Sequence, residues 1–510
     1  MSFLNTLSVI AAFLHLATAW TVGQEVETTS GRVKGTAASI HPEVSAYLGI
    51  PYVAAPIGNL RWRPPQPFPK SNETLAADKF GFDCPALSDT PRNTSNPLVN
   101  AIQSILSQSG HAQSEDCLTV NIWTKPQIGE KKKAVLVWIY GGGFSTGAAN
   151  NPSYDGSIFA EKQDVVVVSF NYRLNIFGFP SAPGLESLNP GILDQRAAVE
   201  WVKANIENFG GDSSRITLFG ESAGSRSVDI YAYAWAEAKD PIVNGFICES
   251  GSAPWTAGNN WNPQVWYSLS ARLGCGGVEK GSETVACMRT KPFQDILQAS
   301  KSGPEKPELF RRFYPVTDEK VVFGDYDKRA AAGRFIQKPL LIGNNDNEYG
   351  LQGTLAKFQG KPLSNRTLLV GNLGYICSAK VQAQRRMDKG VKAWRYRWMG
   401  VFPNQQIGKD AGAWHGSEIP HVFGTIVLQQ SRVKATEDQL KVSGLMNNAW
   451  AAFAKDPETG LSKLGWPLYD EKESSLILLA ENNGPGATFA PGAKYDGQCG
   501  LIQNNIPQLP

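Results

Sequence analysis

Short apolar runs that recur between helical segments constrain the fold of this chain more than any other feature. The runs of strand length that are rich in β-branched or aromatic residues cover 134–140, 165–173, 216–220, 245–250, 339–343 and 393–398. Several are apolar at both the odd and the even positions, which is typical of parallel strands covered on both faces. This pattern predicts an α/β fold, a doubly wound, mostly parallel twisted sheet with helices on both faces.

A helix is expected between the second and third runs. Leu193, Ala197, Trp201 and Ala204 recur at spacings of four, four and three, and Gly210-Gly211 ends the segment. The chain has 510 residues, of which 42% are hydrophobic and 19% charged, so a large core can form. Because no internal repeat, low-complexity tract or linker is visible, we expect residues 20–510 to form a single domain.

The N-terminal segment predicts export. Its apolar stretch, 7–19, is shorter than the roughly 20 residues that span a bilayer, and it ends in Ala17-Thr18-Ala19, a small-x-small cleavage site. We therefore expect residues 1–19 to be a signal peptide and the protein to be secreted and extracellular; a buried N-terminal helix is the alternative. The C-terminal "NNIPQLP" has no hydrophobic anchor tail, and we expect no stable membrane anchor.

Glycosylation acceptors and cysteines agree with an extracellular protein. Asn72, Asn93 and Asn365 each begin an N-x-[ST] triplet on a polar segment. Among the seven cysteines, Cys84 and Cys117 flank one loop and Cys275 and Cys287 flank a shorter one, so each pair can form a disulfide. Seven is odd, so at least one thiol stays free or pairs with another chain. The spacings match no zinc site, and no metal is expected.

The net charge of +3 gives no reason to expect a nucleic-acid partner. The densest basic run, 131–133, leads into an apolar strand and is interpreted as a solvated segment.

The stretch "LFGESAGSRS" (218–227) contains a G-x-S-x-G motif around Ser222. The motif alone is weak, because short patterns recur by chance. Here it follows the strand "ITLF" and precedes residues that can begin a helix, which is the context of a nucleophile elbow. The alternative is a glycine turn with an incidental serine.

A serine nucleophile needs a base, and two histidines follow Ser222 in the chain, His415 and His421. His415 lies in the Gly-flanked "GAWHGSEIP", whereas His421 begins the apolar "HVFG" and is expected to be a packed residue. The acid should lie between nucleophile and histidine. "LLIGNNDNEYG" offers Asp346 and Glu348 just after a strand, and spacing does not choose between them.

The oxyanion of an ester-cleaving enzyme needs backbone donors. "WIYGGGFSTG" places Gly141, Gly142 and Gly143 directly after a strand, and the N–H of Ala223 follows the nucleophile. A phosphate-binding loop is excluded because neither G-x-x-x-x-G-K-[ST] nor G-x-G-x-x-G spacing is present.

The chain resembles the type-B carboxylesterase/cholinesterase family of α/β-hydrolases over most of its length. The matching stretches are "YLGIPYVAAPIGNLRWRPPQP", "SEDCLTVNIW", "VWIYGGGF", "NYRLNIFGF", "NFGGDSSRITLFGESAG", "SGSAPW" and "WHGSEIPHVFG". The resemblance implies an α/β-hydrolase fold with large loop insertions and ester hydrolysis without a cofactor. The site residues that it implies are Ser222 as nucleophile, His415 as base, Glu348 as acid, Gly142, Gly143 and Ala223 as oxyanion donors, and the disulfides Cys84–Cys117 and Cys275–Cys287.

Four features depart from the family pattern. Asn347 replaces the usual Asp and Tyr349 the usual Gly beside the acid. The first disulfide loop contains no Phe, Trp or Tyr between Pro85 and Asp116, so choline esters are not expected as preferred substrates. Arg226 stands where the family has a small residue, and we expect a carboxylate to pair with it as a structural ion pair rather than an anionic substrate group.

The segment 96–109 in the first disulfide loop has the pattern of an amphipathic helix. In related fungal lipases this loop is a lid, and a permanently packed helix is the alternative.

The leading hypothesis is a secreted serine carboxylic-ester hydrolase that acts on small-molecule or lipid esters. A lidded lipase or sterol esterase is the nearest alternative, and a catalytically inactive cholinesterase-like binding or adhesion protein is an alternative from another class. The acyl and alcohol specificity, the pairing of Cys248, Cys377 and Cys499, and possible homodimer formation stay open.

Overall fold

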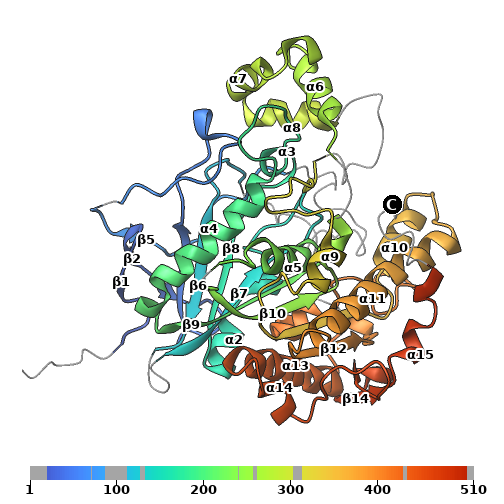
Figure 1. Cartoon of the computed structure of the whole chain (residues 1–510). Helices are drawn as coiled ribbons and strands as arrows, with labels where there is room; N and C mark the ends of the chain where they lie inside the picture. Colours follow the sequence, from blue (N-terminus) through green and yellow to red (C-terminus); the bar gives the residue numbers. More distant parts are fainter. Residues whose placement is uncertain are drawn as a thin grey trace, which may run out of the picture.

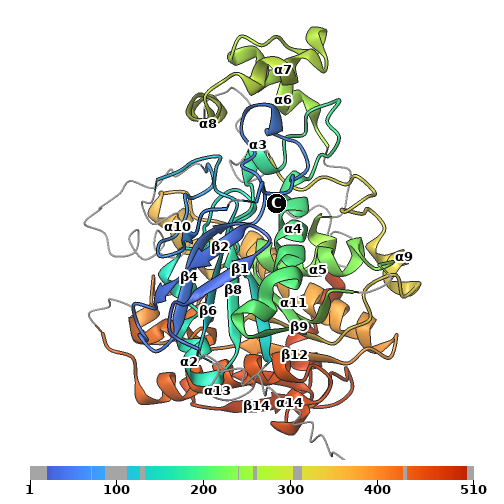
Figure 2. The same ribbon diagram turned by 90° about the vertical axis from the view of Figure 1, so that its left-hand side faces the viewer.

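A large mixed sheet runs through the molecule (Figures 1 and 2). The computed structural model describes residues 20–70, 72–86, 112–126, 132–238, 241–256, 261–301, 313–428 and 433–501. In spatial order, the 11 strands are β14 (Ala487–Ala490), β13 (Leu476–Leu479), β12 (Ala393–Trp398), β11 (Leu340–Asn345), β10 (Val243–Glu249), β9 (Gly211–Glu221), β7 (Lys133–Ile139), β8 (Val166–Phe170), β6 (Thr119–Thr124), β4 (Ser45–Pro51) and β3 (Thr36–Ala37).

The middle of this sheet is parallel. Strands β8, β7, β9, β10, β11, β12 and β13 all run in the same direction, and each expected apolar run falls on one of them. At the two edges, β14 is antiparallel to β13, and β6, β4 and β3 are antiparallel to their neighbours. The predicted mostly parallel α/β sheet is therefore confirmed, with antiparallel strands added at both edges.

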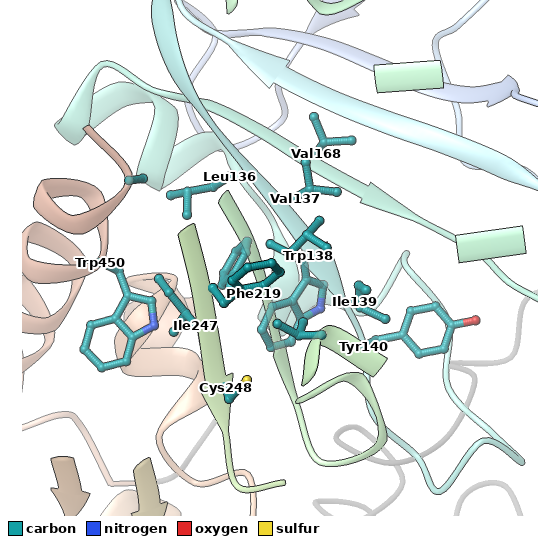
Figure 3. Close-up of a cluster of buried hydrophobic side chains, with 14 of the residues drawn as sticks. Leu136, Val137, Trp138, Ile139, Tyr140, Val168, Phe219, Ile247, Cys248 and Trp450 are labelled. Atoms are coloured by element: carbon teal, nitrogen blue, oxygen red, sulfur yellow. The ribbon is translucent and has the colours of Figure 1, made fainter. Parts of the chain in front are cut away.

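Every residue of β7, β8, β11 and β12 is buried, because helices cover both faces of the sheet. Figure 3 shows Trp138 of β7 beside Phe219 of β9, with ring centroids 4.8 Å apart, and Trp450 entering the same core from a helix. Large aromatic side chains bury much apolar surface and contribute strongly to the stability of such a core.

Helices lie on both sides of the sheet, with α4, α5 and α11 along one side and α13 on the other (Figure 2). The longer ones are α4 (Pro190–Asn205), α5 (Ala223–Ala234), α11 (Asn365–Met387) and α13 (Glu437–Lys455). A separate group, α6 (Pro263–Arg272), α7 (Glu283–Arg289) and α8 (Phe293–Lys301), forms its own small apolar cluster and projects at the top of Figure 1. Among the described residues, none of the helices has the length and apolarity needed to cross a bilayer.

Helix α4 is the helix expected between the second and third runs, but its most buried face is not the one on which the expected spacing falls. Ile192, Val199 and Val202 are buried, whereas Ala204 is exposed. The residues at the expected spacing form one stripe along the helix, and the residues that face the sheet form the stripe next to it. A 3-10 turn and Gly210, at φ 84°, end the segment as expected.

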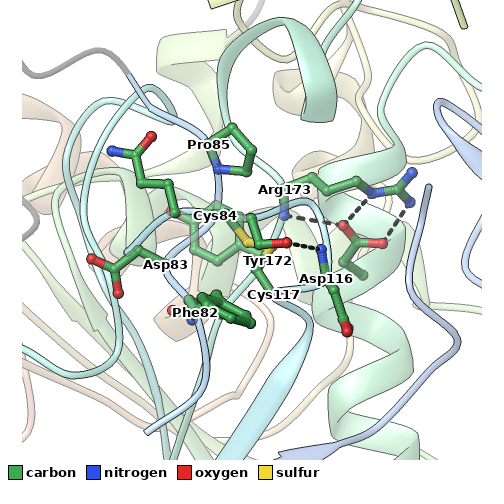
Figure 4. The surroundings of a disulfide bond; sticks show 12 residues. Phe82, Asp83, Cys84, Pro85, Asp116, Cys117, Tyr172 and Arg173 are labelled. Atoms are coloured by element: carbon green, nitrogen blue, oxygen red, sulfur yellow. Dashed lines mark hydrogen bonds and ion pairs between the residues drawn. A yellow bond between two sulfur atoms is a disulfide. The ribbon is translucent and has the colours of Figure 1, made fainter. Parts of the chain in front are cut away.

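Three disulfides tie distant parts of the chain together. Cys84–Cys117 and Cys275–Cys287 are both present, and Cys377–Cys499 joins α11 to the C-terminal region. Figure 4 shows the first of them beside Tyr172 and Arg173. Cys248 keeps a free thiol that is buried in β10 and therefore does not reach another chain.

Two of the three glycosylation acceptors, Asn72 and Asn365, are exposed. Asn93, the predicted signal peptide 1–19 and the 96–109 segment lie outside the described residues.

Candidate active site

Ser222 occupies the sharp turn between β9 and α5. Its φ of 56° and ψ of −117° lie in a region that residues other than glycine rarely adopt. The Ser222 N–H donates to the Glu249 carbonyl at 2.9 Å, and the Ser222 carbonyl accepts from the Arg226 N–H at 2.9 Å. The strained turn is thus held from both sides, as expected for an elbow that presents a side chain at a sheet edge.

The glycines that flank Ser222 are required by close packing against the end of β7. A Cβ at Gly220 would lie 2.6 Å from the Ile139 carbonyl oxygen, and a Cβ at Gly224 would lie 1.8 Å from the same atom. No side chain can be accommodated at these distances. The G-x-S-x-G pattern therefore reflects how tightly this turn packs on the neighbouring strand.

His415 lies in the loop that follows β12 and is buried. Its Nδ1 lies 2.6 Å from Glu348 Oε2, and Glu348 Oε1 accepts from the Asn345 N–H at 2.7 Å. Asp346, the other acid that the sequence left open, pairs instead with Arg397 at 2.7 Å. With a proton on Nδ1, the ring presents Nε2 as an acceptor.

The Asn347 N–H donates to the Ala413 carbonyl at 3.0 Å, which joins the loop that carries Glu348 to the loop that carries His415. The replacement of the family's usual Asp by Asn347 is accommodated by amide contacts. Its Nδ2 donates to the carbonyl oxygens of Asp410 and Ala411. The loop geometry beside the acid is therefore held by neutral hydrogen bonds.

Further acids surround this pair, in addition to those predicted from the sequence. Glu221 Oε1 lies 3.1 Å from His415 Nε2, and Glu418 Oε2 accepts from the Asn345 side chain. Glu249 Oε1 accepts from Trp450 Nε1 at 2.7 Å. Glu221 lies inside the serine motif and Glu418 lies three residues after His415, whereas Glu249 comes from the separate strand β10 and had no signal in the sequence.

These acids are buried, which opposes ionisation. Burial and then the charge of Glu348 raise the pKa of Glu221 well above its usual range. Burial, followed by the charges of Glu221 and Glu348, raises the pKa of Glu418 to about 8. Burial and the Glu418 charge raise the pKa of Glu249. The acids behind His415 therefore hold protons at neutral pH, which limits the negative charge there.

Gly142 and Gly143 form a tight turn after β7. Their φ angles are 103° and 62°, and the Gly142 carbonyl accepts from the N–H groups of Ser145 and Thr146 at 3.1 Å each. Within the described ranges, no hydrogen bond takes the N–H groups of Gly142, Gly143 or Ala223. They are thus available to an oxyanion.

The glycine turn and the histidine border the same space. A small cavity with room for about one water molecule lies between them and is lined by Gly141, Gly142, Gly147, Tyr154, Glu221, His415, Gly416 and Ile419. The ring of Tyr375 packs on the other side of His415, at 4.9 Å between centroids. The structure therefore joins His415 to Glu348 and places His415 and Gly142 around one cavity. Ser222 lies next to this cavity, because a Cβ on Gly141 would lie 2.9 Å from the Ser222 Cβ.

His421 is fully buried and does not join this group. Its Nε2 lies 3.2 Å from Gln439 Nε2, and its ring packs on Trp398 at 4.5 Å between centroids. The expectation that it is a packed residue agrees with this position.

Comparisons with known proteins give the family. The family model for the carboxylesterase family matches residues 22–365 and 355–491. The chain belongs to the carboxylesterase family. It is therefore a carboxylic-ester hydrolase with an α/β-hydrolase fold.

Characterised relatives of this carboxylesterase cover nearly its whole length. Secreted lipase 5 from Gibberella zeae is 33% identical over 95% of this chain and 95% of its own length. A chlorogenic acid esterase from Aspergillus niger is 31% identical over 90% of this chain and 91% of its own length. An acetylcholinesterase from Bungarus fasciatus is 31% identical over 91% of this chain and 84% of its own length. The relatives thus share the fold while differing in the esters for which they are named.

Arg226 is a position at which this carboxylesterase departs from the family pattern. Its Nη1 donates a hydrogen bond to the Tyr314 hydroxyl. The structural ion pair with a carboxylate that the sequence suggests for Arg226 stays a prediction. The acid whose ionisation the Arg226 charge favours is Glu221, next to the nucleophile.

Proposed function

We propose that this protein is a secreted serine esterase that hydrolyses small-molecule or lipid carboxylic esters through an acyl-enzyme on Ser222. The observation that carries the proposal is the 2.6 Å contact between His415 Nδ1 and Glu348 Oε2, beside a serine held in a strained turn. That contact fixes the tautomer in which Nε2 is a base. Residues 20–510 act as one domain, and no cofactor takes part in the steps below.

In the first half-reaction, Ser222 Oγ attacks the ester carbonyl carbon while His415 Nε2 takes its proton. Nε2 lies near Glu221 in the resting structure, so the ring turns toward Oγ when substrate binds. The N–H groups of Gly142, Gly143 and Ala223 bind the oxyanion. The intermediate then collapses, the bond to the alcohol breaks, and His415 returns the proton to the departing alcohol.

In the second half-reaction, water replaces the alcohol. His415 Nε2 takes a proton from the water as it attacks the acyl carbon, and the same N–H groups bind the second oxyanion. Collapse releases the carboxylic acid and returns the proton to Ser222 Oγ. Glu348 stabilises the imidazolium in both halves without itself taking the proton.

Export follows from the predicted signal peptide, residues 1–19. The relative named Secreted lipase 5 and the three disulfides favour an oxidising, extracellular destination. Asn72 and Asn365 are accessible for glycosylation, and Asn93 remains a predicted site.

The name of the same relative makes a lidded lipase the second candidate. In that case the 96–109 segment acts as the lid, and activity rises at a lipid–water interface.

A series of p-nitrophenyl esters from C2 to C16 tests both candidates on the secreted protein. Ser222→Ala should abolish hydrolysis of every ester, while Ser462→Ala, an exposed serine on α14 (Gly460–Lys463), should leave it unchanged. Residual turnover by Ser222→Ala would contradict the acyl-enzyme. Highest activity on short-chain esters identifies an esterase. Highest activity on long-chain esters, at concentrations above their solubility limit, identifies the lipase.

A further inference from the structure

Arg226 lies one turn of α5 after the nucleophile. Its Nη1 donates to the Tyr314 hydroxyl, and its guanidinium carbon lies 5.9 Å from the centroid of the Tyr314 ring. Tyr314 in turn meets Phe144 edge to face, at 5.1 Å between centroids. Phe144 directly follows Gly143, so Tyr314 links the Arg226 side chain to the loop that carries the oxyanion donors.

Tyr349, a second departure from the family pattern, lies close to the histidine. A Cβ on Gly371 of α11 would lie 2.3 Å from the Tyr349 ring, so this glycine leaves the space that the ring fills. One turn later on α11, Tyr375 lies 6.5 Å from Tyr349 and 4.9 Å from His415, measured between ring centroids. Arg226, Tyr314, Tyr349 and Tyr375 thus form one wall of the site, which ends at His415.

The electrostatics place the Arg226 charge at this wall. Burial raises the pKa of the Tyr375 phenol, and the positive charge of Arg226 is the largest effect that opposes the rise. The Arg226 charge also lowers the pKa of Glu221 against the effect of burial. The guanidinium is therefore within electrostatic reach of Tyr375 and Glu221, which both contact the His415 ring, as Glu348 also does.

Part of this wall is accessible to solvent. Ser222, Arg226, Tyr314 and Tyr349 are each half-buried, whereas the residues next to them in the chain, such as Ala223 and Glu348, are buried. Four positions from three segments, with the nucleophile among them, are therefore each partly accessible.

A substrate that carries a carboxylate meets a positive charge at this wall. The buried acids Glu221, Glu249 and Glu418 have raised pKa values and hold protons at neutral pH, so they oppose the attraction of the carboxylate to Arg226 only weakly. A guanidinium presents five N–H donors in a planar fork that matches a carboxylate. We propose that Arg226, oriented by Tyr314, binds a carboxylate on the substrate, so that this enzyme selects esters whose acid or alcohol part is anionic.

This inference rests on the proposed ester hydrolysis and names its substrate class. Two other roles compete with it. Arg226 as a purely structural residue would change stability and the turnover of all esters together. Arg226 as a counter-charge for Glu221 would change the pH dependence of kcat for all esters, with no preference for anionic ones.

The test compares matched ester pairs that differ by one carboxylate. Monoethyl succinate against ethyl butanoate places the charge on the acid part, and 4-acetoxybenzoate against phenyl acetate places it on the alcohol part. In Arg226→Gln, the ratio of kcat/KM for the anionic ester to that for its neutral partner should fall about 10- to 100-fold in at least one pair, the size of a lost charge-assisted hydrogen bond. Arg226→Lys should restore part of that ratio, and 0.5 M NaCl should lower it in the wild type.

Two further variants act as controls. Tyr314→Phe should lower the ratio less than Arg226→Gln, because the charge stays while its orientation is lost. Arg196→Gln should leave the ratio unchanged, since Arg196 makes the same kind of bond to the Tyr231 hydroxyl, at 2.6 Å, on α4 and away from the site.

An unchanged ratio in Arg226→Gln, or an equal fall for both members of each pair, would overturn the inference. Turnover of the neutral esters that disappears in Ser222→Ala would still support the proposed function in that case. If the wild type hydrolysed none of these esters, or if Ser222→Ala hydrolysed them as fast as the wild type, the result would instead contradict the proposed function.

Discussion

Two histidines six positions apart, His415 and His421, are both buried in this protein, yet their surroundings are opposite in kind. His415 lies between two acidic side chains, Glu348 at 2.6 Å and Glu221 at 3.1 Å. His421 meets the amide of Gln439 and two aromatic rings, and burial lowers its pKa to about 3. Burial alone therefore does not decide the chemistry of a histidine, which depends also on the groups placed beside it.

The largest difference between the two histidines should be seen in turnover. His415→Gln should lower kcat by as much as about 10⁶-fold, the cost measured for a triad histidine in a serine hydrolase. His421→Gln should keep kcat within about 10-fold, because a buried side chain that does not contact the reacting atoms affects stability rather than turnover. Rates on p-nitrophenyl butanoate, with Ser222→Ala as the blank, check both values. Comparable losses in the two variants would mean that His421, and not only His415, serves the reaction.

The carboxylate beside His415 is the next element to remove. Glu348→Gln should keep the hydrogen bond but lose the charge, and kcat should fall about 10⁴-fold. Asp346→Asn is the matched control, since Asp346 lies two residues away and pairs with Arg397. Its kcat should stay close to that of the wild type. A larger loss in Asp346→Asn than in Glu348→Gln would reverse the assignment of the acid.

Much of the fold was predictable from the sequence because the central strands are buried on both faces. The runs at β7 and β8 are apolar at nearly every position, a pattern that few other structures produce. The helix α4 was predictable in extent but not in its buried face. Ala204 is small enough to tolerate either side, so its place in the spacing carried little information.

The site was predictable where a motif or chain order constrained it, and not elsewhere. Asp346 and Glu348 both follow β11, and only the turn geometry directs one of them toward His415. Glu249 and Glu418 could not be found, because acids are usually exposed and their burial here depends on packing between distant segments. Arg226 was noticed as unusual, but its phenol partner, Tyr314, lies 88 positions away.

His421 should make the fold sensitive to acid. Its pKa is lowered to about 3 in the folded state from 6.5, so its stabilising contribution is present above pH 6.5 and is lost as the pH falls toward 3. Between pH 6.5 and 4 the free energy of unfolding should drop by about 3 kcal/mol through this group. Urea unfolding at several pH values, compared between wild type and His421→Gln, isolates that part. Parallel pH curves for the two proteins would contradict the lowered pKa.

Glu418 lies between the two histidines in the chain and should give the opposite, smaller effect. Its pKa is raised to about 8 from 4.5, so its contribution is complete below pH 4.5 and is lost as the pH rises through 8. From pH 6 to 8 the free energy of unfolding should fall by about 2 kcal/mol through this group. Glu418→Gln keeps the shape of the protonated acid and should flatten the alkaline side of the curve.

Glu418 accepts from Asn345, the residue whose N–H also binds Glu348, while its own carbonyl accepts from the His421 N–H at 2.8 Å. If Glu418→Gln flattens the alkaline side while leaving the acid side intact, the two histidine surroundings titrate independently. A change on both the acid and the alkaline side of the curve would instead show that the segment from His415 to His421 couples the titration of the two surroundings. The two histidines would then belong to one hydrogen-bonded network.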